Sequence, residues 1–211
     1  MKPMKNTLLV FGIASMLFTS SCQKTTEETS KIKTDKTQKE ASVFTQKTNN
    51  ELLNYLPFSD KTDYENAKKG FIATLESGVI KDADGNIIYS MKQYDFIKGD
   101  APTSTNPSLW RQSELNSING LFEVTEGVYQ IRGFDLANMS LIKGEKGWII
   151  VDPLLSPETA KAGLDLANKE LGERPVTAVI ITHSHIDHFG GIRGIVDEAD
   201  VLSGKIPIYV P

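Results

Sequence analysis

The chain has 211 residues, enough for one ordinary domain or for a domain with an extension. Hydrophobic residues make up 39% and charged residues 24%, which indicates a globular protein and excludes a disordered, collagenous or polytopic membrane protein. The 23 basic and 27 acidic residues give a net charge of −4, so no basic stripe is left for binding DNA or RNA. The one cysteine, Cys22, excludes a disulfide within the chain.

The first 21 residues have the layout of a secretory signal peptide. Two lysines precede an apolar run from Leu8 to Phe18, which is shorter than the about 20 apolar residues that a membrane-spanning helix needs. The small residues before Cys22 resemble the lipobox of bacterial lipoproteins, although Thr19 stands where leucine is usual. This resemblance implies a lipid on Cys22 that anchors an exported protein to a membrane of the bacterial cell envelope, in the periplasm or at the outer membrane. The alternative is a secreted protein without an anchor.

Residues 22–42 are expected to form a disordered tether. Between Gln23 and Ser42 only Ile32 and Ala41 are apolar, so the segment cannot bury enough surface to offset its ordering entropy.

Residues 43–120 are expected to form an N-terminal extension with a helix, a hairpin and a loop. The spacing of apolar residues predicts one helix over Asp60–Leu75. Two short apolar runs, Val79–Ile80 and Ile87–Tyr89, flank the turn-forming sequence KDADGN and predict a β-hairpin. The prolines within residues 99–108 indicate a surface loop.

Four short strands in quick succession predict an antiparallel meander. They are expected at Leu121–Thr125, Val128–Arg132, Met139–Lys143 and Trp148–Val151. The last is apolar throughout, which is typical of a strand covered on both faces. A helix should then begin after Ser156, with Pro157 as its first residue, and end at Gly172. A second buried strand is predicted over Val176–Ile181.

The sequence THSHIDHFGG, residues 182–191, follows this strand and contains all three histidines of the chain. Four of its residues can bind metal: His183, His185, Asp187 and His188. Their spacing spans most of a helical turn, so only a loop can bring them together. We assign the first two histidines to one zinc ion, and Asp187 with His188 to a second. Nitrogen and oxygen donors favour zinc, with manganese or iron as alternatives, over copper(I). Asp187 is also our candidate catalytic residue.

The alternative is a surface loop whose histidines cap turns, or core histidines that bond to their neighbours. Asp152, at the end of the first buried strand, is a candidate for orienting the histidine loop, or else a turn acceptor before Pro153. Gly190 and Gly191 should let the chain turn closely away from the metals into a helix near Ile192–Ala199. A final strand is predicted over Ile206–Val210.

The strand, the THxHxDHxGG loop and the following helix resemble the metallo-β-lactamase superfamily over residues 121–211. The resemblance implies an α/β fold, an αββα sandwich around one or two metal ions, of which this segment is about the first half. His185 stands where the diiron flavoprotein branch carries glutamate, which implies a zinc hydrolase.

Residues 106–142 and the sequence LPFSDKTDYENAKKGFIA, residues 56–73, resemble the alkylsulfatase branch of that superfamily. This resemblance implies two zinc ions, a small-molecule substrate that is a sulfate ester of a long-chain alcohol, and a homodimer in full-length members. Such members are much longer and carry further metal ligands. Because two zinc ions need about six to eight donors and four are visible, we expect this polypeptide alone to bind metal weakly and to be inactive.

Two other functions stay open at this stage. One is a different hydrolase of the same fold, acting on thioesters, lactams or phosphodiesters. The other is a non-catalytic envelope lipoprotein that uses the histidine cluster to hold zinc.

Overall fold

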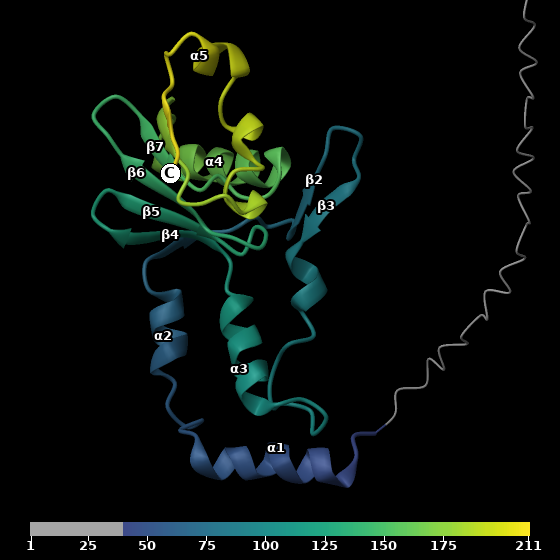
Figure 1. The fold of residues 1–211 in the computed structure, drawn as a ribbon. Coiled ribbons are helices and arrows are strands. Elements are labelled where there is room, and N and C mark those ends of the chain that lie inside the picture. Colours follow the sequence, from purple (N-terminus) through teal and green to yellow (C-terminus); the bar gives the residue numbers. More distant parts are fainter. Residues whose placement is uncertain (1–39) are drawn as a thin grey trace, which may run out of the picture. The chain divides into compact units, whose positions relative to one another are not determined.

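The structure is a computed structural model, and it describes residues 40–211 (Figure 1). The expected signal peptide (residues 1–21), the lipidation site Cys22 and most of the expected tether (residues 22–42) lie outside the described residues. Within the described part, no helix combines the length and apolar character needed to cross a membrane.

A seven-stranded sheet in the order β1-β4-β5-β6-β7-β8-β9 forms the centre of the fold. Its strands are β1 (Phe71–Ala73), β4 (Gly120–Thr125), β5 (Val128–Arg132), β6 (Met139–Lys143), β7 (Trp148–Val151), β8 (Val176–Ile180) and β9 (Ile208–Tyr209). Neighbouring strands are antiparallel from β1 to β7, which confirms the predicted meander. From β7 to β9 the strands run parallel.

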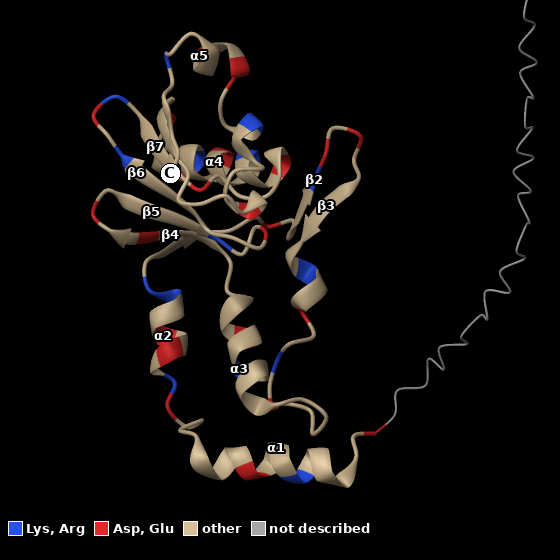
Figure 2. Cartoon of the chain, viewed as in Figure 1, with Lys and Arg blue, Asp and Glu red and all other residues tan. Residues whose placement is uncertain are grey.

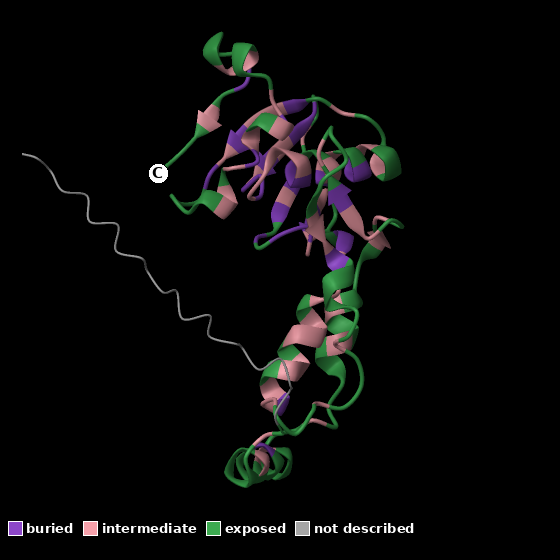
Figure 3. Ribbon diagram, turned by 90° about the vertical axis from the view of Figure 1, so that its right-hand side faces the viewer, coloured by how far each residue is buried: buried purple, intermediate pink, exposed green. Residues whose placement is uncertain are grey.

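Helix α4 (Pro157–Leu171) covers one face of this sheet, with Ser156 as its N-cap and Gly172 at its C-cap, as predicted. The helix lies close to the sheet at Gly163, where a Cβ atom would lie 2.8 Å from Cε of Met139. The residues of the buried core come mainly from the strands of this sheet and from α4, and Figure 3 shows the buried residues gathered in that part of the fold.

The opposite face of the sheet is only half-buried by the described residues. Alternate residues of β6, β7 and β8 point to it, namely Ile142, Ile149, Val151, Ala178 and Ile180. The expectation that β7 is covered on both faces is therefore not met within residues 40–211, where Trp148 and Ile150 are buried but their neighbours are not. An apolar face without a covering layer is what the first half of a two-sheet sandwich presents.

Among the described residues, from residue 40 onward, three helices and a hairpin precede the meander. They are α1 (Val43–Tyr55), α2 (Thr62–Lys68), β2 (Val79–Lys81), β3 (Ile87–Ser90) and α3 (Pro107–Asn116), with a 3-10 turn η1 (Met91–Tyr94) after the hairpin. The hairpin is confirmed. Helices α1 and α3 were not predicted, and α3 begins inside the expected loop over residues 99–108. Their N-caps, Ser42 and Asn106, are the local signals for both helices. Figure 2 shows acidic and basic residues interspersed along these elements.

The predicted helix over Asp60–Leu75 is wrong in its second half. Helix α2 ends at Lys68, and β1 then pairs with β4. Gly70 separates the two elements with a φ of +75°, and a Cβ atom there would lie 2.0 Å from the backbone oxygen of Glu123. The apolar residues after Gly70 therefore form a strand, because their pairing with β4 outweighs the local helical pattern.

The predicted helix over Ile192–Ala199 is also wrong. The chain forms a single 3-10 turn, η3 (Ile192–Gly194), and then the short helix α5 (Glu198–Leu202). At Gly194 a Cβ atom would lie 2.0 Å from the backbone oxygen of Pro157, so this segment packs directly on the start of α4. That contact fixes the path of the chain and interrupts a continuous helix.

Candidate metal centre

The histidine loop and Asp152 leave the sheet at the same edge. Strands β7 and β8 are parallel neighbours, with Val151 opposite Ile180. Asp152 is the residue after β7, and its backbone N–H donates to the oxygen of Ile180 at 3.0 Å. Since the carboxyl ends of parallel strands point the same way, the two segments must emerge side by side.

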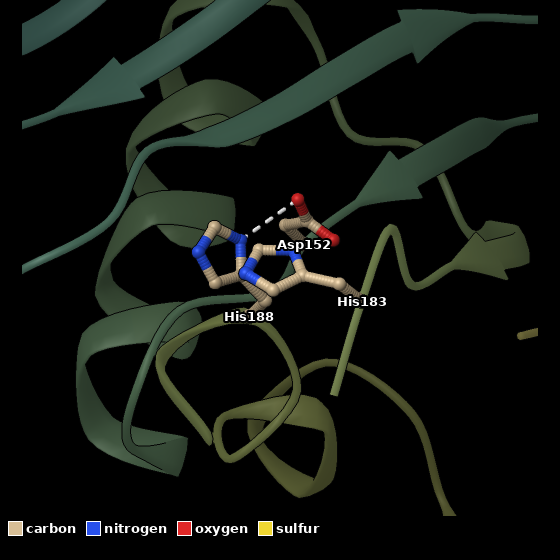
Figure 4. Close-up of side chains that lie close together, drawn as sticks. All are labelled: Asp152, His183 and His188. Atoms are coloured by element: carbon tan, nitrogen blue, oxygen red, sulfur yellow. Dashed lines mark hydrogen bonds and ion pairs between the residues drawn. The ribbon is translucent and has the colours of Figure 1, made fainter. Parts of the chain in front are cut away.

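The carboxylate of Asp152 joins the start of the loop to its end. It is buried, and it accepts hydrogen bonds from the backbone N–H of Thr182 at 2.8 Å and from the Thr182 hydroxyl at 2.6 Å. It also lies 2.9 Å from Nδ1 of His188 (Figure 4). Burial alone raises the pKa of Asp152, but the hydrogen bonds from Thr182 and His188 outweigh burial and hold this pKa below its usual value. This is the geometry that an orienting role for Asp152 requires.

These contacts also determine which ring nitrogen carries the hydrogen in His183 and in His188. An ionised Asp152 can only accept, so Nδ1 of His188 must carry the hydrogen. The Thr182 hydroxyl donates to Asp152 and can therefore accept from Nδ1 of His183, which lies 2.9 Å away. Both imidazoles then keep a free lone pair on Nε2, and that is the state a metal ligand needs.

The three imidazoles lie against one another. The ring centroids of His183 and His188 are 4.0 Å apart, and those of His183 and His185 are 4.7 Å apart. Nε2 of His188 lies 3.4 Å from Oδ2 of Asp187. Two ligand atoms about 2.1 Å from one tetrahedral zinc ion are about 3.4 Å apart. The donor types and this spacing fit a zinc ion held by Asp187 and His188.

One group of three potential ligands that lie close together differs from the predicted ligand set. Asp152, His183 and His188 each offer an atom within 4.8 Å of the other two, whereas His185 is exposed and meets the group through its ring contact with His183. The distance of 2.9 Å between Oδ2 of Asp152 and Nδ1 of His188 is that of a hydrogen bond. With the two bonds from Thr182, this carboxylate takes part in three hydrogen bonds. We therefore keep Asp152 as an orienting group and the four loop residues as the proposed ligands.

Gly190 and Gly191 let the end of the histidine loop pack against the backbone of residues 153–155, which follow β7. The N–H of Gly191 donates to the oxygen of Leu154 at 2.9 Å. A Cβ atom on Gly191 would lie 2.0 Å from the oxygen of Pro153, and one on Gly190 would lie 2.2 Å from that of Leu155. The predicted close turn is present, and it requires glycine at both positions.

Thr182 is a site residue that the sequence reasoning missed. It lies inside the motif, but nothing in the motif shows that its hydroxyl connects Asp152 to His183. A threonine at the end of a strand directly before a metal-binding histidine was the available signal.

This fold and this cluster of potential metal ligands are those of the metallo-β-lactamase type. Residues 132–211 match the family model described as the metallo-beta-lactamase superfamily. The resemblance to the alkylsulfatase branch is confirmed as well. The chain is 56% identical over 177 residues to a linear primary-alkylsulfatase of a Pseudomonas species, a match that covers 83% of this chain and 26% of the relative.

Two further relatives agree with this. An alkyl/aryl-sulfatase of Saccharomyces cerevisiae is 47% identical over 174 residues, covering 82% of this chain and 27% of the relative. The solved structure of the stereoselective inverting sec-alkylsulfatase Pisa1 from a Pseudomonas species matches with a TM-score of 0.76 and 50% identity, covering 81% of this chain and 27% of that one. The chain thus spans about a quarter of the length of the relatives it matches.

Proposed function

We propose that this chain carries the metal-binding segment of a zinc-dependent hydrolase that acts on alkyl sulfate esters. The proposal rests on two observations together. The chain is 47–56% identical to alkylsulfatases over 82–83% of its length, and in the histidine loop, which lies within residues 132–211 matched by the family model, Asp187 and His188 have the spacing of ligands to one ion.

The residues of the chain have distinct tasks in this proposal. The four loop residues would hold zinc, and a zinc ion bound there would lower the pKa of a coordinated water towards neutrality, so that a nucleophile is available at neutral pH. Asp152 keeps Nδ1 of His188 protonated, so that Nε2 is free to bind. Asp187, the proposed catalytic residue, presents Oδ2 next to this nitrogen and can accept a hydrogen bond from an attacking water.

Hydrolysis of dodecyl sulfate tests the proposed activity, with released inorganic sulfate as the readout. We expect the product of the whole reading frame that contains this chain to release sulfate, and a His185→Ala variant of it to be inactive. The 211-residue polypeptide alone should release no more sulfate than its own His185→Ala control. Hydrolysis of a thioester, lactam or phosphodiester in place of the sulfate ester would contradict the proposed substrate class, and zinc binding without any hydrolysis would indicate a zinc-holding protein.

The proposed location is the bacterial cell envelope, with a lipid on Cys22 as the membrane anchor, and the proposed assembly is a homodimer. The support for the anchor is the arrangement of residues 1–22 alone. Mass spectrometry of the membrane fraction should detect a lipidated Cys22 as the first residue of the mature protein. Recovery of an unmodified Cys22 in the soluble fraction would contradict it.

A further inference from the structure

The segment that joins β7 to α4 is held in an unfavourable backbone conformation. Asp152 has a φ of +53° and Leu154 a φ of +60°, and these are the non-glycine residues with positive φ among residues 40–211. Such conformations persist only where surrounding contacts enforce them. Leu154 is fully buried, so its side chain is one such contact.

The carboxylate of Asp135 supplies a second contact. Asp135 lies in the connection between β5 and β6, and it is buried. Its Oδ2 accepts from the backbone N–H of Leu155 at 2.9 Å and from the hydroxyl of Thr159 at 2.6 Å, while its Oδ1 accepts from the N–H of Ala137 at 3.0 Å. Within residues 40–211, no basic side chain pairs with it.

A buried carboxylate without a cation is costly, so its position calls for a reason. The three donors and the N-terminus of α4 compensate the charge, because the dipole of a helix favours a negative group at that end. The structural effect is that Asp135 fixes Leu155, three residues after Asp152.

The same short segment meets the metal loop twice. Asp152 at its start holds Thr182 and His188, and the oxygen of Leu154 accepts from the N–H of Gly191. Any relaxation of the two left-handed residues would therefore move the Asp152 carboxylate relative to His188.

We propose that Asp135 is a positioning residue of the metal centre. It acts through the backbone of residues 152–155, touches no metal ligand, and keeps Asp152 aligned with Nδ1 of His188. This inference rests on the proposed metal site, and it is independent of the sulfatase activity.

Asp135→Asn tests the proposal, because asparagine has the same shape but turns one acceptor into a donor that faces an N–H or O–H group. Zinc affinity of the 211-residue chain, measured by competition with a chelator, should fall about 10- to 100-fold. The visible absorption of bound Co²⁺, which reports ligand geometry, should change. In the metal-free chain, the NMR signal of the His188 Nδ1 proton should exchange faster with water.

A second pair of variants covers the case in which Asp135→Asn does not fold. Thr159→Ser keeps the hydroxyl that Asp135 accepts from and should bind zinc like the wild type, whereas Thr159→Val should bind more weakly. Leu121→Val, a buried change in β4, serves as the control for lost stability alone.

The inference on Asp135 is wrong if Asp135→Asn leaves both the zinc affinity and the His188 proton signal as in the wild type, or alters them no more than Leu121→Val does. If neither the 211-residue chain nor the product of the whole reading frame binds zinc, the proposed function fails. The His188 signal of the metal-free chain still decides the role of Asp135 in that case.

Discussion

Asp152 and His188 are 36 positions apart in the sequence, and Oδ2 of the first lies 2.9 Å from Nδ1 of the second. The aspartate directly follows β7, and the histidine lies in the 3-10 turn η2 (Ile186–His188) that follows the neighbouring strand β8. This contact determines which nitrogen of His188 faces the proposed metal. It therefore connects the parallel part of the sheet to the chemistry of the loop.

Substitution of Asp152 by asparagine should weaken zinc binding about 10- to 100-fold, the usual cost of losing a partner that orients a ligand. Asparagine tolerates the left-handed conformation at this position, so the loss reports the hydrogen bonds and not the backbone. Chelator competition measures it. Asp165→Asn, on the exposed side of α4, is the matched control and should bind like the wild type. Equal affinities for both variants would refute the orienting role.

We assign His185 to one zinc ion and His188 to the other. We therefore expect His185→Ala and His188→Ala to remove different ions. At a zinc concentration that saturates the wild type, each single variant should retain about half of the bound metal, and the double variant should retain none. Native mass spectrometry counts the ions directly. Loss of all zinc from either single variant would indicate one shared ion instead of two.

Gly191→Ala should lower the free energy of unfolding by about 1–3 kcal/mol, the usual cost of overpacking. The φ of −82° at Gly191 suits alanine, so the cost comes from the oxygen of Pro153, 2.0 Å from the added Cβ. Urea unfolding measures the loss. Gly144→Ala is the control, because its nearest neighbour is 3.1 Å away and the loss should be clearly smaller. Equal stabilities of the two variants would show that the loop does not pack as described.

Gly70→Ala and Gly85→Ala separate backbone strain from steric contact. Both positions have positive φ, +75° and +86°, so both variants incur the left-handed cost of about 1–2 kcal/mol. Only Gly70 has a close neighbour, the oxygen of Glu123. Thermal unfolding should therefore show a clearly larger loss for Gly70→Ala. A similar loss in both variants would mean that β1 does not pair with β4 as the structure has it.

Much of the fold could be predicted because its signals are local. Strands β4 to β7 are short runs separated by turn residues, and α4 has its cap and its proline in the sequence. The ligand candidates could be named because all three histidines lie in one short motif.

What the sequence could not reveal depends on residues distant along the chain. The helical spacing past Gly70 looked continuous because Glu123, which its backbone meets, lies 53 positions further on. Thr182 bonds to a carboxylate 30 positions away, and Asp135 bonds to a hydroxyl 24 positions away. Only the packed fold brings these partners together.

The parallel pairing of β7 with β8 makes the centre sensitive to insertions. Val151 faces Ile180; Asp152 follows Val151 directly, and His183 comes three residues after Ile180. One residue added within either strand would shift the pairing by about 3.3 Å and turn the following side chains to the other side of the sheet. A residue added to the turn between β2 and β3, which belong to a separate two-stranded sheet, would leave this alignment unchanged, so length variation is tolerable there and not within β7 or β8.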